Sequence, residues 1–521
     1  MSEAEATLEI RKRLRRTWNT FFGRFGKLLP IQVRTVPVVL QGRNAVVCSP
    51  TASGKTEAVV APIAEMLLDN PRSGLSVVYV SPTRALVNDL YERLADPLSG
   101  LGLSVAVKTG DRLQFEPSKP RNFLLTTPEA LDSLICRNSR VFENVRFLVL
   151  DELHLIDKTY RGDQLRILLR RFRQLVQGDL CLYALSATLS NPKEIAKRYL
   201  GDSVILSVPG TRELEYELFG SLDRALATAR ERRMHKVLIF CNRRKEVEEV
   251  AGECKDFWPE DRIVVHHGKL DKKVRDESET FMRQCQWGLC VATMTLEIGV
   301  DIGDIDAVML YGAPWSVSSL IQRVGRGNRR RHTSVAFGIY RNPEEKLIFR
   351  DMFERAKEGD VEDWPYEPDP SVVVQQIFSY LYQNPGGLEE DLLFSLFEEF
   401  ISTETVTAIL SHLERLGYIE KRTGRWFAST KIMNMGERGI IHSNISDPRD
   451  YLVIDATTGA KLGEVSAVLV ENVFRIAGKA WKLVGIDGAS LYVVPAKGDA
   501  VAEFSKSPAK GAFSWLLPPG I

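Results

Sequence analysis

Hydrophobic residues occur along this chain as short continuous runs, each followed by small or polar residues and then by a longer stretch with helical spacing. Such runs, which do not alternate with polar residues, are typical of strands that are buried on both faces of a parallel sheet. They span residues 45–48, 76–80, 105–107, 123–125, 147–150 and 182–185, and then 236–240, 262–265, 289–292 and 307–310. This rhythm predicts an α/β fold with two successive doubly wound parallel-sheet lobes, each with right-handed crossovers.

The pattern changes in the last third of the chain. Residues 344–370 are rich in Glu, Asp and Pro, which predicts an exposed linker or a helix plus linker. Three helical patterns over 371–382, 389–400 and 402–416 precede a glycine-tipped basic hairpin, which predicts a winged helix. Strand-like runs from about 440 to 518 alternate with Gly and Asp turns and predict a small β-rich module.

These patterns give four expected domains. They cover residues 1–205, 206–345, 346–430 and 431–521. The winged helix has two open interpretations, direct DNA contact or bracing of the two lobes. Trp426 and Trp481 are candidates for stacking on bases, although a core position is the commoner role for a tryptophan.

Composition narrows the class of protein. A chain of 521 residues is too long for one core, and 44% hydrophobic with 26% charged residues is ordinary for a soluble globular protein. The net charge of +1 excludes a uniformly basic nucleic-acid binder but allows local basic runs such as 323–331. Seven cysteines without a Cys-x-x-Cys pair, and no apolar stretch of membrane-spanning length, lead us to expect a cytoplasmic protein without a membrane.

The segment after the first apolar run has the residues of an anion-binding loop. It consists of Ser49, Pro50, Thr51, Ala52, Ser53, Gly54, Lys55 and Thr56. A strand, a small-residue loop and a helix N-terminus direct backbone N–H groups at phosphate oxygens. Lys55 would then reach the β- and γ-phosphates of ATP, and Thr56 would bind Mg²⁺. The usual pattern opens with Gly where this chain has Ser49, and an ordinary strand-turn-helix is the alternative.

Two carboxylates follow the apolar run 147–150. Asp151 and Glu152 stand at the end of a predicted buried strand, roughly a hundred residues after the Gly-Lys-Thr loop. One carboxylate there can hold the Mg²⁺-water shell while the other polarises an attacking water. Upstream, Gln32 offers an acceptor and two donors that can pair with the edge of adenine. A surface Gln beside a core-packing aromatic cluster is the alternative.

Several other predicted strands end in hydroxyl, Gly, Pro or amide residues. In the first lobe these are Pro82, Thr83, Arg84, Thr109, Gly110, Thr127 and Pro128, and in the second Asn242, Arg243, Thr293 and Thr295. Each segment alone is a normal strand-to-helix turn. Together they lie at the carboxyl edge of a parallel sheet, where ligands bind, and predict a surface that grips a nucleic-acid backbone.

A basic motif closes the second lobe. Gln322, Arg326 and Arg329 form the pattern Gln-x-x-Gly-Arg-x-x-Arg. Arginines spaced by three fall on one helix face or one turn, and a planar guanidinium suits a phosphoryl group in transfer. Two arginine fingers are therefore the favoured interpretation over a solvated basic surface.

The succession Gly-Lys-Thr, Ser-Pro-Thr-Arg-Ala-Leu, Thr-Gly-Asp, Thr-Thr-Pro-Glu, Asp-Glu-Leu-His and Ser-Ala-Thr resembles the first motor lobe of superfamily 2 DExH-box helicases. The detailed residue sequence of these motifs, including Leu-Glu-Ile-Gly-Val-Asp, is similar to that of the Lhr (large helicase-related) family. The resemblance implies RecA-like lobes, with Asp151 on Mg²⁺ and Glu152 as general base. It further implies that Asp301 touches the ribose. The coupling residues that it implies are His154, Ser186, Thr188 and Gln322.

We therefore expect an ATP- and Mg²⁺-dependent helicase or translocase, acting as a monomer. Resemblance to Lhr implies single-stranded or forked DNA, movement from 3′ to 5′ and a role in DNA repair. An RNA-remodelling ATPase and the motor subunit of a larger repair or defence complex are alternatives. A nucleic-acid scaffold with an inactive motor is disfavoured, because the chain has all five of Lys55, Asp151, Glu152, Arg326 and Arg329.

Overall fold

The computed structural model describes residues 3–50, 53–112, 114–187, 191–208, 213–268, 270, 272–296, 302–327, 333–362, 365–445, 451–459, 461–465, 473–476, 479–487, 490–495 and 511–521. The chain forms two compact units. The first comprises residues 1–158 and 165–367, and the second comprises residues 159–164 and 368–521. The first unit contains the two predicted α/β lobes.

The first lobe is built on a seven-stranded parallel sheet with strand order β3-β4-β2-β5-β6-β1-β7. Its strands are β1 (Ala45–Cys48), β2 (Val77–Val80), β3 (Val105–Lys108), β4 (Phe123–Thr126), β5 (Phe147–Leu150), β6 (Cys181–Ser186) and β7 (Val204–Ser207). Its helices are α1 (Glu3–Arg13), α2 (Trp18–Phe21), α3 (Pro30–Leu40), α4 (Lys55–Asp69), α5 (Arg84–Gly100), α6 (Pro128–Asn138), α7 (Tyr160–Leu175) and α8 (Pro192–Ile195). The first turn of α7 is counted with the second unit.

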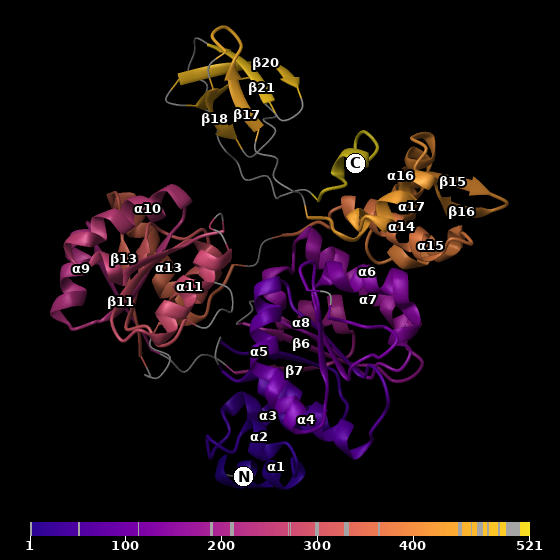
Figure 1. The fold of residues 1–521 in the computed structure, drawn as a ribbon, viewed down its shortest axis with the longest axis horizontal. Helices are drawn as coiled ribbons and strands as arrows, with labels where there is room; N and C mark the ends of the chain where they lie inside the picture. The colour runs from indigo at the N-terminus through magenta and orange to yellow at the C-terminus, as the bar shows by residue number, and fades with distance from the viewer. Residues whose placement is uncertain are drawn as a thin grey trace. The chain divides into compact units, whose positions relative to one another are not determined.

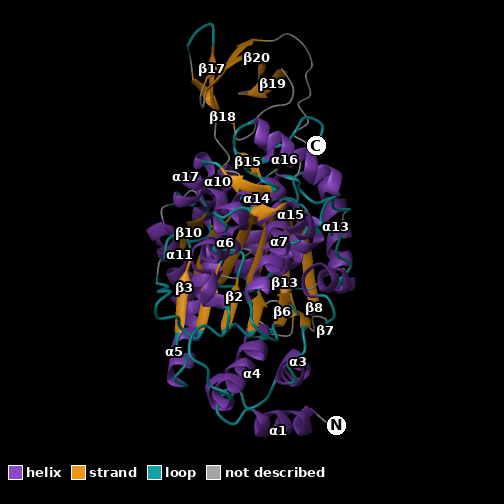
Figure 2. Cartoon of the chain, turned by 90° about the vertical axis from the view of Figure 1, so that its right-hand side faces the viewer, coloured by secondary structure: helices purple, strands orange, loops and turns teal. Residues whose placement is uncertain are grey.

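Both faces of this sheet are buried, which explains the unbroken apolar runs. Successive strand residues point to opposite faces. Val47 and Val149 pack with α3, α4 and α5, whereas Val46 and Leu148 pack with α6 and α7. Figures 1 and 2 show the strands of the lobes between layers of helices.

The second lobe repeats this design with a six-stranded parallel sheet of order β10-β11-β9-β12-β13-β8. Its strands are β8 (Glu213–Phe219), β9 (Lys236–Cys241), β10 (Ile263–His266), β11 (Gly288–Ala292), β12 (Ala307–Tyr311) and β13 (Thr333–Ile339). Its helices are α9 (Leu222–Glu231), α10 (Arg244–Glu253), α11 (Lys272–Gln284), α12 (Val317–Val324) and α13 (Pro343–Glu358). The predicted fold of two doubly wound lobes is confirmed.

Two of the expected boundaries need correction. The first lobe continues past residue 205, because β7 pairs with β1 as far as Ser207. The second lobe continues past residue 345, because α13 buries Phe349 and Phe353 in the same core as Leu310 of β12. Of the two alternatives for residues 344–370, the structure therefore has a helix followed by a linker, and this amphipathic helix packs on the sheet.

The second unit contains the predicted winged helix. Its helices are α14 (Ser371–Gln383), α15 (Glu390–Phe397), α16 (Thr403–Arg415) and α17 (Thr430–Glu437), and its antiparallel strands are β14 (Leu388–Glu389), β15 (Ile419–Arg422) and β16 (Arg425–Ala428). Thr423 and Gly424 both have positive φ, as a two-residue hairpin requires. Trp426 is 3% exposed, so its place is in the core of this unit.

The β-rich module is also present, as a sheet of order β18-β17-β21-β20-β19. Its strands are β17 (Tyr451–Asp455), β18 (Lys461–Val465), β19 (Val473–Ile476), β20 (Lys479–Asp487) and β21 (Ser490–Pro495). The expected boundary at 430/431 is wrong, because the residues just before this sheet and those after it belong to the winged helix. α17 packs on α14, and Phe513 stacks edge-on against Phe378 of α14, because these apolar side chains complete the winged-helix core. The side chain of Trp481 lies outside the described residues.

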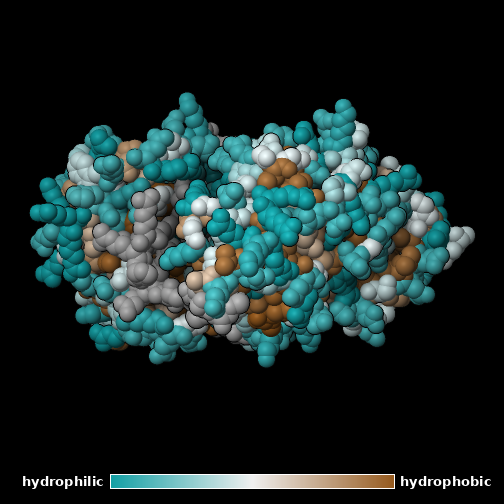
Figure 3. All heavy atoms as spheres, turned by 90° about the horizontal axis from the view of Figure 1, so that it is seen from below, coloured by the Kyte–Doolittle hydropathy of each residue, from teal (hydrophilic) through white to brown (hydrophobic). Residues whose placement is uncertain are grey.

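Among the described residues, no helix combines the length and the apolar character needed to cross a membrane. The face of the molecule in Figure 3 is mostly hydrophilic, with hydrophobic residues gathered in small patches.

Candidate functional site

The carboxyl ends of β1, β5 and β6 lie side by side in the first sheet, so the loops that follow them meet at one edge. The loop after β1 leads into α4 through Gly54, which caps the helix with a φ of 78°. Gln32 of α3 lies against this loop: its amide nitrogen donates to the Gly54 carbonyl (3.3 Å) and its amide oxygen accepts from the Leu29 N–H (2.9 Å). A Cβ at Gly54 would stand 2.2 Å from the Gln32 nitrogen, so glycine permits this approach. Thr51 and Ala52 lie outside the described residues.

Lys55 is turned into its own loop. Its Nζ donates to the carbonyls of Ser49 (2.5 Å) and Pro50 (2.9 Å), and the residue is 6% exposed. The buried ammonium thus lies against the start of the loop that leads into the N-terminus of α4. This is a donor set for an anionic ligand.

The pKa values of the two acidic residues, Asp151 and Glu152, are shifted in opposite directions. Burial raises the pKa of Asp151 to about 7, and the charge of Glu152 adds to this rise while Lys55 and Arg93 oppose it. Burial would also raise the pKa of Glu152, but Lys55, His154, Arg326 and Arg93 outweigh it and hold that pKa below its ordinary value. The cations around the pair therefore favour a charged Glu152.

His154 connects this carboxylate to the next strand. Its Nδ1 accepts from the Ala187 N–H (3.2 Å) and lies 3.3 Å from Ser186 Oγ and 3.4 Å from Glu152 Oε2. Burial lowers the pKa of His154, which favours the neutral ring that accepts at Nδ1. The structure thus brings together three of the predicted residues, Glu152, His154 and Ser186. Thr188 lies outside the described residues.

Sequence reasoning missed Arg93 and Tyr79. Arg93 of α5 donates through Nη2 to Thr56 Oγ1 (3.3 Å) and pairs with Asp89 one turn earlier (3.2 Å). Burial and the charge of Asp151 raise the pKa of Tyr79 well above its ordinary value. The signal in the sequence was the Asp89–Arg93 spacing of four, but such pairs are common on exposed helices.

The second lobe contributes Arg326, which is 2% exposed and whose charge helps to lower the pKa of Glu152. Nearby, Gln322 donates to Ser318 Oγ at 3.5 Å. Arg323, buried over the ring of Phe240, donates to Asn242 Oδ1 at 2.9 Å. Asp301 and Arg329 lie outside the described residues.

In the first lobe, the residues at the strand ends are largely engaged with their own backbone. The hydroxyls of Thr83 and Thr127 accept from the N–H groups of Leu86 and Ala130, which caps α5 and α6, and Pro128 is the first residue of α6. Thr109 Oγ1 accepts from the Arg112 N–H. Arg84 pairs with Asp111 at 2.6 Å and lies so close to Gly110 that a Cβ there would meet its guanidinium at 2.5 Å. Pro82, the residue before Thr83, lies in the turn between β2 and α5.

In the second lobe, the residues at the strand ends also form hydrogen bonds within their own lobe. Asn242 donates to the Ala313 carbonyl (2.8 Å), and the Arg243 N–H donates to Glu246 at the start of α10 (3.0 Å). The Thr293 N–H donates to the His266 carbonyl (3.1 Å), and the side chain of Thr295 lies outside the described residues. The arrangement therefore offers helix N-termini and the exposed Arg84 and Arg243 rather than a row of uncommitted side chains.

The donor set also fits a magnesium ion. Thr56 supplies a hydroxyl oxygen at the start of α4, and Asp151 supplies a carboxylate whose charged form burial disfavours. Hard oxygen ligands are those that Mg²⁺ takes from proteins, and a nearby cation favours a charged carboxylate.

Comparison with known families agrees with this geometry. Residues 29–195 match the DEAD/DEAH box helicase family, and residues 217–331 match the helicase conserved C-terminal domain. The two lobes and the site at their strand ends therefore define a superfamily 2 helicase core. Within this class, curated proteins that are similar to the chain carry the name ATP-dependent helicase Lhr-Core.

Three of these relatives align with most of the chain. The chain is 29% identical to an ATP-dependent helicase Lhr-Core of Methanothermobacter thermautotrophicus over 88% of its length, and 27% identical to that of Methanocaldococcus jannaschii over 94%. It is 29% identical to Lhr-Core protein 2 of Thermococcus barophilus over 96%. The chain spans only 61%, 64% and 65% of these three relatives.

Solved structures share the fold. The Mycobacterium smegmatis helicase Lhr bound to ssDNA and AMP-PNP superposes with a TM-score of 0.72 at 23% identity, covering 83% of this chain and 62% of that one. The DUF1998 helicase MrfA bound to DNA gives a TM-score of 0.68 at 21% identity, covering 96% and 74%.

Proposed function

We propose that this protein is an ATP-driven translocase that moves along single-stranded DNA and unwinds forked duplexes, from 3′ to 5′ and as a monomer, in DNA repair or related DNA processing. The observation that carries the motor assignment is the environment of Glu152. Lys55 from the phosphate loop and Arg326 from the other lobe both act on this carboxylate. A general base between a phosphate-binding lysine and an arginine finger is the arrangement that phosphoryl transfer to water needs.

Each residue then has a defined task. Lys55, Gly54 and the first turn of α4 bind phosphate oxygens, and Gln32 contacts the adenine edge. Thr56 and Asp151 hold Mg²⁺. When bound, ATP and Mg²⁺ supply the phosphoryl group and the cation that neutralises its charge. Glu152 takes the proton of the attacking water at its carboxylate, and Arg326, with Arg329, stabilises the charge that develops on the phosphoryl oxygens.

Coupling to movement follows from the contacts of His154. This ring joins Glu152 to the Ser186 segment, so a change at the base is passed to the end of β6. The helix N-termini at Thr83 and Thr127, with Arg84 in the first lobe and Arg243 in the second, grip backbone phosphates in turn. Asp301, Thr188, Gln322 and Thr295 complete this assignment through the resemblance to helicases.

The choice of DNA rests on relatives. The Mycobacterium smegmatis Lhr structure contains ssDNA, and the MrfA structure contains DNA. ATPase rates without polymer, with single-stranded DNA and with single-stranded RNA of equal length, at one salt concentration, test this choice. We expect stimulation by DNA; stimulation by RNA alone would make the protein an RNA-remodelling ATPase.

The base assignment has a direct test. In Glu152→Gln the amide cannot accept the proton, so we expect ATP turnover to fall about 100-fold or more while ATP affinity stays within about threefold. Turnover near that of the wild type would remove Glu152 from this role.

Arg326 tests the contribution of the second lobe. Loss of an arginine finger costs about 10³-fold or more in turnover, so Arg326→Ala should slow hydrolysis far more than it weakens ATP binding. Arg350→Ala, an exposed arginine on α13 of the same lobe, is the matched control and should hydrolyse ATP normally. Equal rates in the two variants would disprove the finger.

A further inference from the structure

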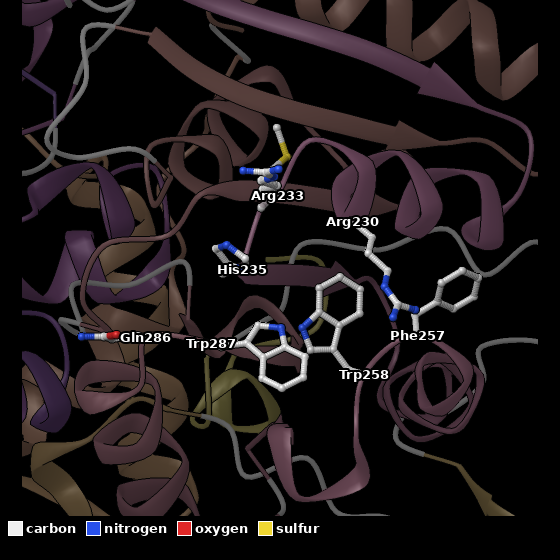
Figure 4. A pocket seen from close by; sticks show the side chains of 8 residues that line it. Arg230, Arg233, His235, Phe257, Trp258, Gln286 and Trp287 are labelled. Carbon is white, nitrogen blue, oxygen red and sulfur yellow. The ribbon is translucent and has the colours of Figure 1, made fainter.

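The second lobe contains a cavity of about 490 Å³ that the motor assignment does not use. Its lining residues are Arg230, Arg233, Met234, His235, Phe257, Trp258, Gln286 and Trp287, and Figure 4 shows their side chains. A volume of this size is typical of small-molecule sites.

The cavity lies at the opposite edge of the sheet from the motor residues. His235 directly precedes β9 and Trp287 directly precedes β11, so both stand at the amino ends of parallel strands. Asn242 and Thr293 follow the carboxyl ends of the same two strands. At about 3.3 Å per residue, strands of five and six residues separate the two edges by roughly 16–20 Å. A ligand in the cavity would therefore occupy a second site.

Two indoles give the cavity an unusual chemistry. Trp258 is 2% exposed, and its Nε1 has no hydrogen-bond partner among the described residues. A buried N–H of this kind costs free energy until an acceptor reaches it. Trp287, by contrast, is 40% exposed. Figure 4 shows the two indoles next to each other, with the nitrogen of Trp258 on the side facing Trp287.

Two arginines supply positive charge at the same place. Arg230 and Arg233 are exposed, and neither side chain forms an ion pair within the described part of the chain. Their neighbour Arg232, in contrast, pairs with Glu217 at 2.6 Å. Arg233 has a φ of 57°, a conformation uncommon for a residue with a side chain, and its N–H donates to the Arg230 carbonyl. The turn thus presents both guanidinium groups without neutralising them.

We propose that this cavity binds a nucleoside phosphate, with the base against Trp287, a base acceptor on Trp258 Nε1 and the phosphate on Arg230 and Arg233. The ligand must supply a flat face, a hydrogen-bond acceptor and negative charge within one small volume. A nucleotide carries all three in one unit, and bases stack on indoles with little regard to sequence. An acidic peptide would satisfy the arginines but leave the indoles without a flat partner. The nucleotide is either free or part of a single strand.

The indole N–H signals provide a test that reports on this cavity alone. The full chain is labelled with ¹⁵N-indole tryptophan, which gives eight indole signals. Trp258→Phe and Trp287→Phe identify two of them. Deoxyadenosine monophosphate, deoxyadenosine, inorganic phosphate, a 5′-phosphorylated tetradeoxyadenylate and a glutamate-rich peptide are then titrated separately. We expect the monophosphate to move the Trp258 signal downfield, as a new hydrogen bond requires, and the nucleoside alone to bind more weakly.

The arginines are tested in the same way with both indoles intact. Arg230→Ala combined with Arg233→Ala should weaken binding of the monophosphate about tenfold or more, whereas Arg224→Ala, on the helix that carries Arg230, should not. Tighter binding of the tetranucleotide would identify a strand as the source, and tighter binding of the mononucleotide a free ligand.

Three outcomes would overturn the proposal. They are an unmoved Trp258 signal with both nucleotide probes, a response to the glutamate-rich peptide but not to nucleotides, and unchanged affinity in the double arginine variant. Because the readout is local, loss of ATPase activity in the motor variants would leave this result intact.

Discussion

At the scale of single residues, the site depends on backbone conformations that few side chains adopt. Glu152 has a φ of 42° between β5 and the turn that carries His154. A non-glycine residue in this region costs on the order of 1–3 kcal/mol, and such strain is concentrated at functional sites. Gly54, with a φ of 78°, adopts such a conformation without this cost, and its lack of a side chain leaves room for the close approach of Gln32.

Gly54→Ala tests this close approach. The added Cβ would displace the Gln32 amide, which would break its bonds to Gly54 and Leu29. We expect ATP affinity to fall about tenfold or more, since each tenfold loss corresponds to only ~1.4 kcal/mol. Fluorescent-nucleotide titration measures the change.

Gly26→Ala is the matched control. Gly26 has a similar φ of 70°, but nothing lies within 4 Å of the position of its added Cβ. It should lose about 1 kcal/mol of stability from backbone strain and bind ATP normally. Equal affinity in both alanine variants would show that Gln32 does not depend on Gly54.

At the scale of elements, α13 shows how a segment that the sequence pattern left open, as a linker or as a helix plus linker, is fixed in the second lobe. Asn342 caps the helix by accepting from the Glu345 N–H (2.8 Å). The Glu345 carboxylate accepts from the backbone N–H groups of Ala313 (3.0 Å) and Arg341 (2.7 Å) and from the Arg341 guanidinium. One buried carboxylate thus ties the start of α13 to the loop after β12.

Glu345→Gln should destabilise this lobe in a pH-dependent way. Burial alone would raise the pKa of Glu345, but these hydrogen bonds hold it below its ordinary value of 4.5. The stabilisation is therefore present above pH 4.5 and is lost as the pH falls through the folded-state pKa. At neutral pH we expect a loss of about 2 kcal/mol, typical of a hydrogen bond to a charged group.

Urea unfolding of the full chain at pH 7 and near pH 4 measures the difference. Glu344→Gln changes the preceding, exposed glutamate of the same helix and should cost less than about 0.5 kcal/mol. A destabilisation by Glu345→Gln that grows on acidification would contradict a lowered pKa for this carboxyl.

At the scale of the whole molecule, the β-rich module is inserted into the winged-helix unit. Asn444, before the module, is fully buried and accepts from the N–H groups of Ala512 (2.9 Å) and Phe513 (3.2 Å), after it. Its amide nitrogen donates to Ser371 at the start of α14 (3.0 Å). The two ends of the insertion are thus adjacent, which is the condition under which domain insertions are tolerated.

Removal of residues 447–510, with a short Gly-Ser linker in their place, should leave the winged-helix unit folded. The core residues Phe513 and Leu516 remain in the chain and complete the packing around α14. We expect an unfolding temperature within about 3 °C of the full chain and an unchanged basal ATPase rate. Calorimetry and ATPase assays check both.

A chain that ends at residue 445 is the control. It also loses Phe513 and Leu516, and roughly 4 kcal/mol of lost burial should lower the unfolding temperature of this unit by about 10 °C. Equal melting of the two shortened chains would show that residues 511–521 do not complete the core.

The apolar runs predicted both sheets but not every strand: β7, β8 and β13 correspond to none of the runs. Strands buried on both faces need no tertiary information to be recognised, whereas β7 lies at the edge of its sheet and alternates half-buried with exposed residues. Lys55, Asp151, Glu152 and His154 could be found because each follows such a run. Arg93 could not, because its distance from Thr56 depends on how α5 crosses the sheet beside α4. The boundaries near 345 and 430 failed for a related reason: an amphipathic helix does not reveal which core it joins.

By itself the sequence determined the fold class, the order of the lobes and the family, since these follow from local periodicity and from motifs of fixed spacing. Only the tertiary structure decided which groups share a charge environment. It brings the charge of Arg326 close enough to lower the pKa of Glu152 and forms the hydrogen bond from the Ala512 N–H to the Asn444 carbonyl. It also places Trp258 in the lining of a cavity. Such relations join residues that are far apart in the chain, and electrostatic and packing energies depend on distance in space rather than along the sequence.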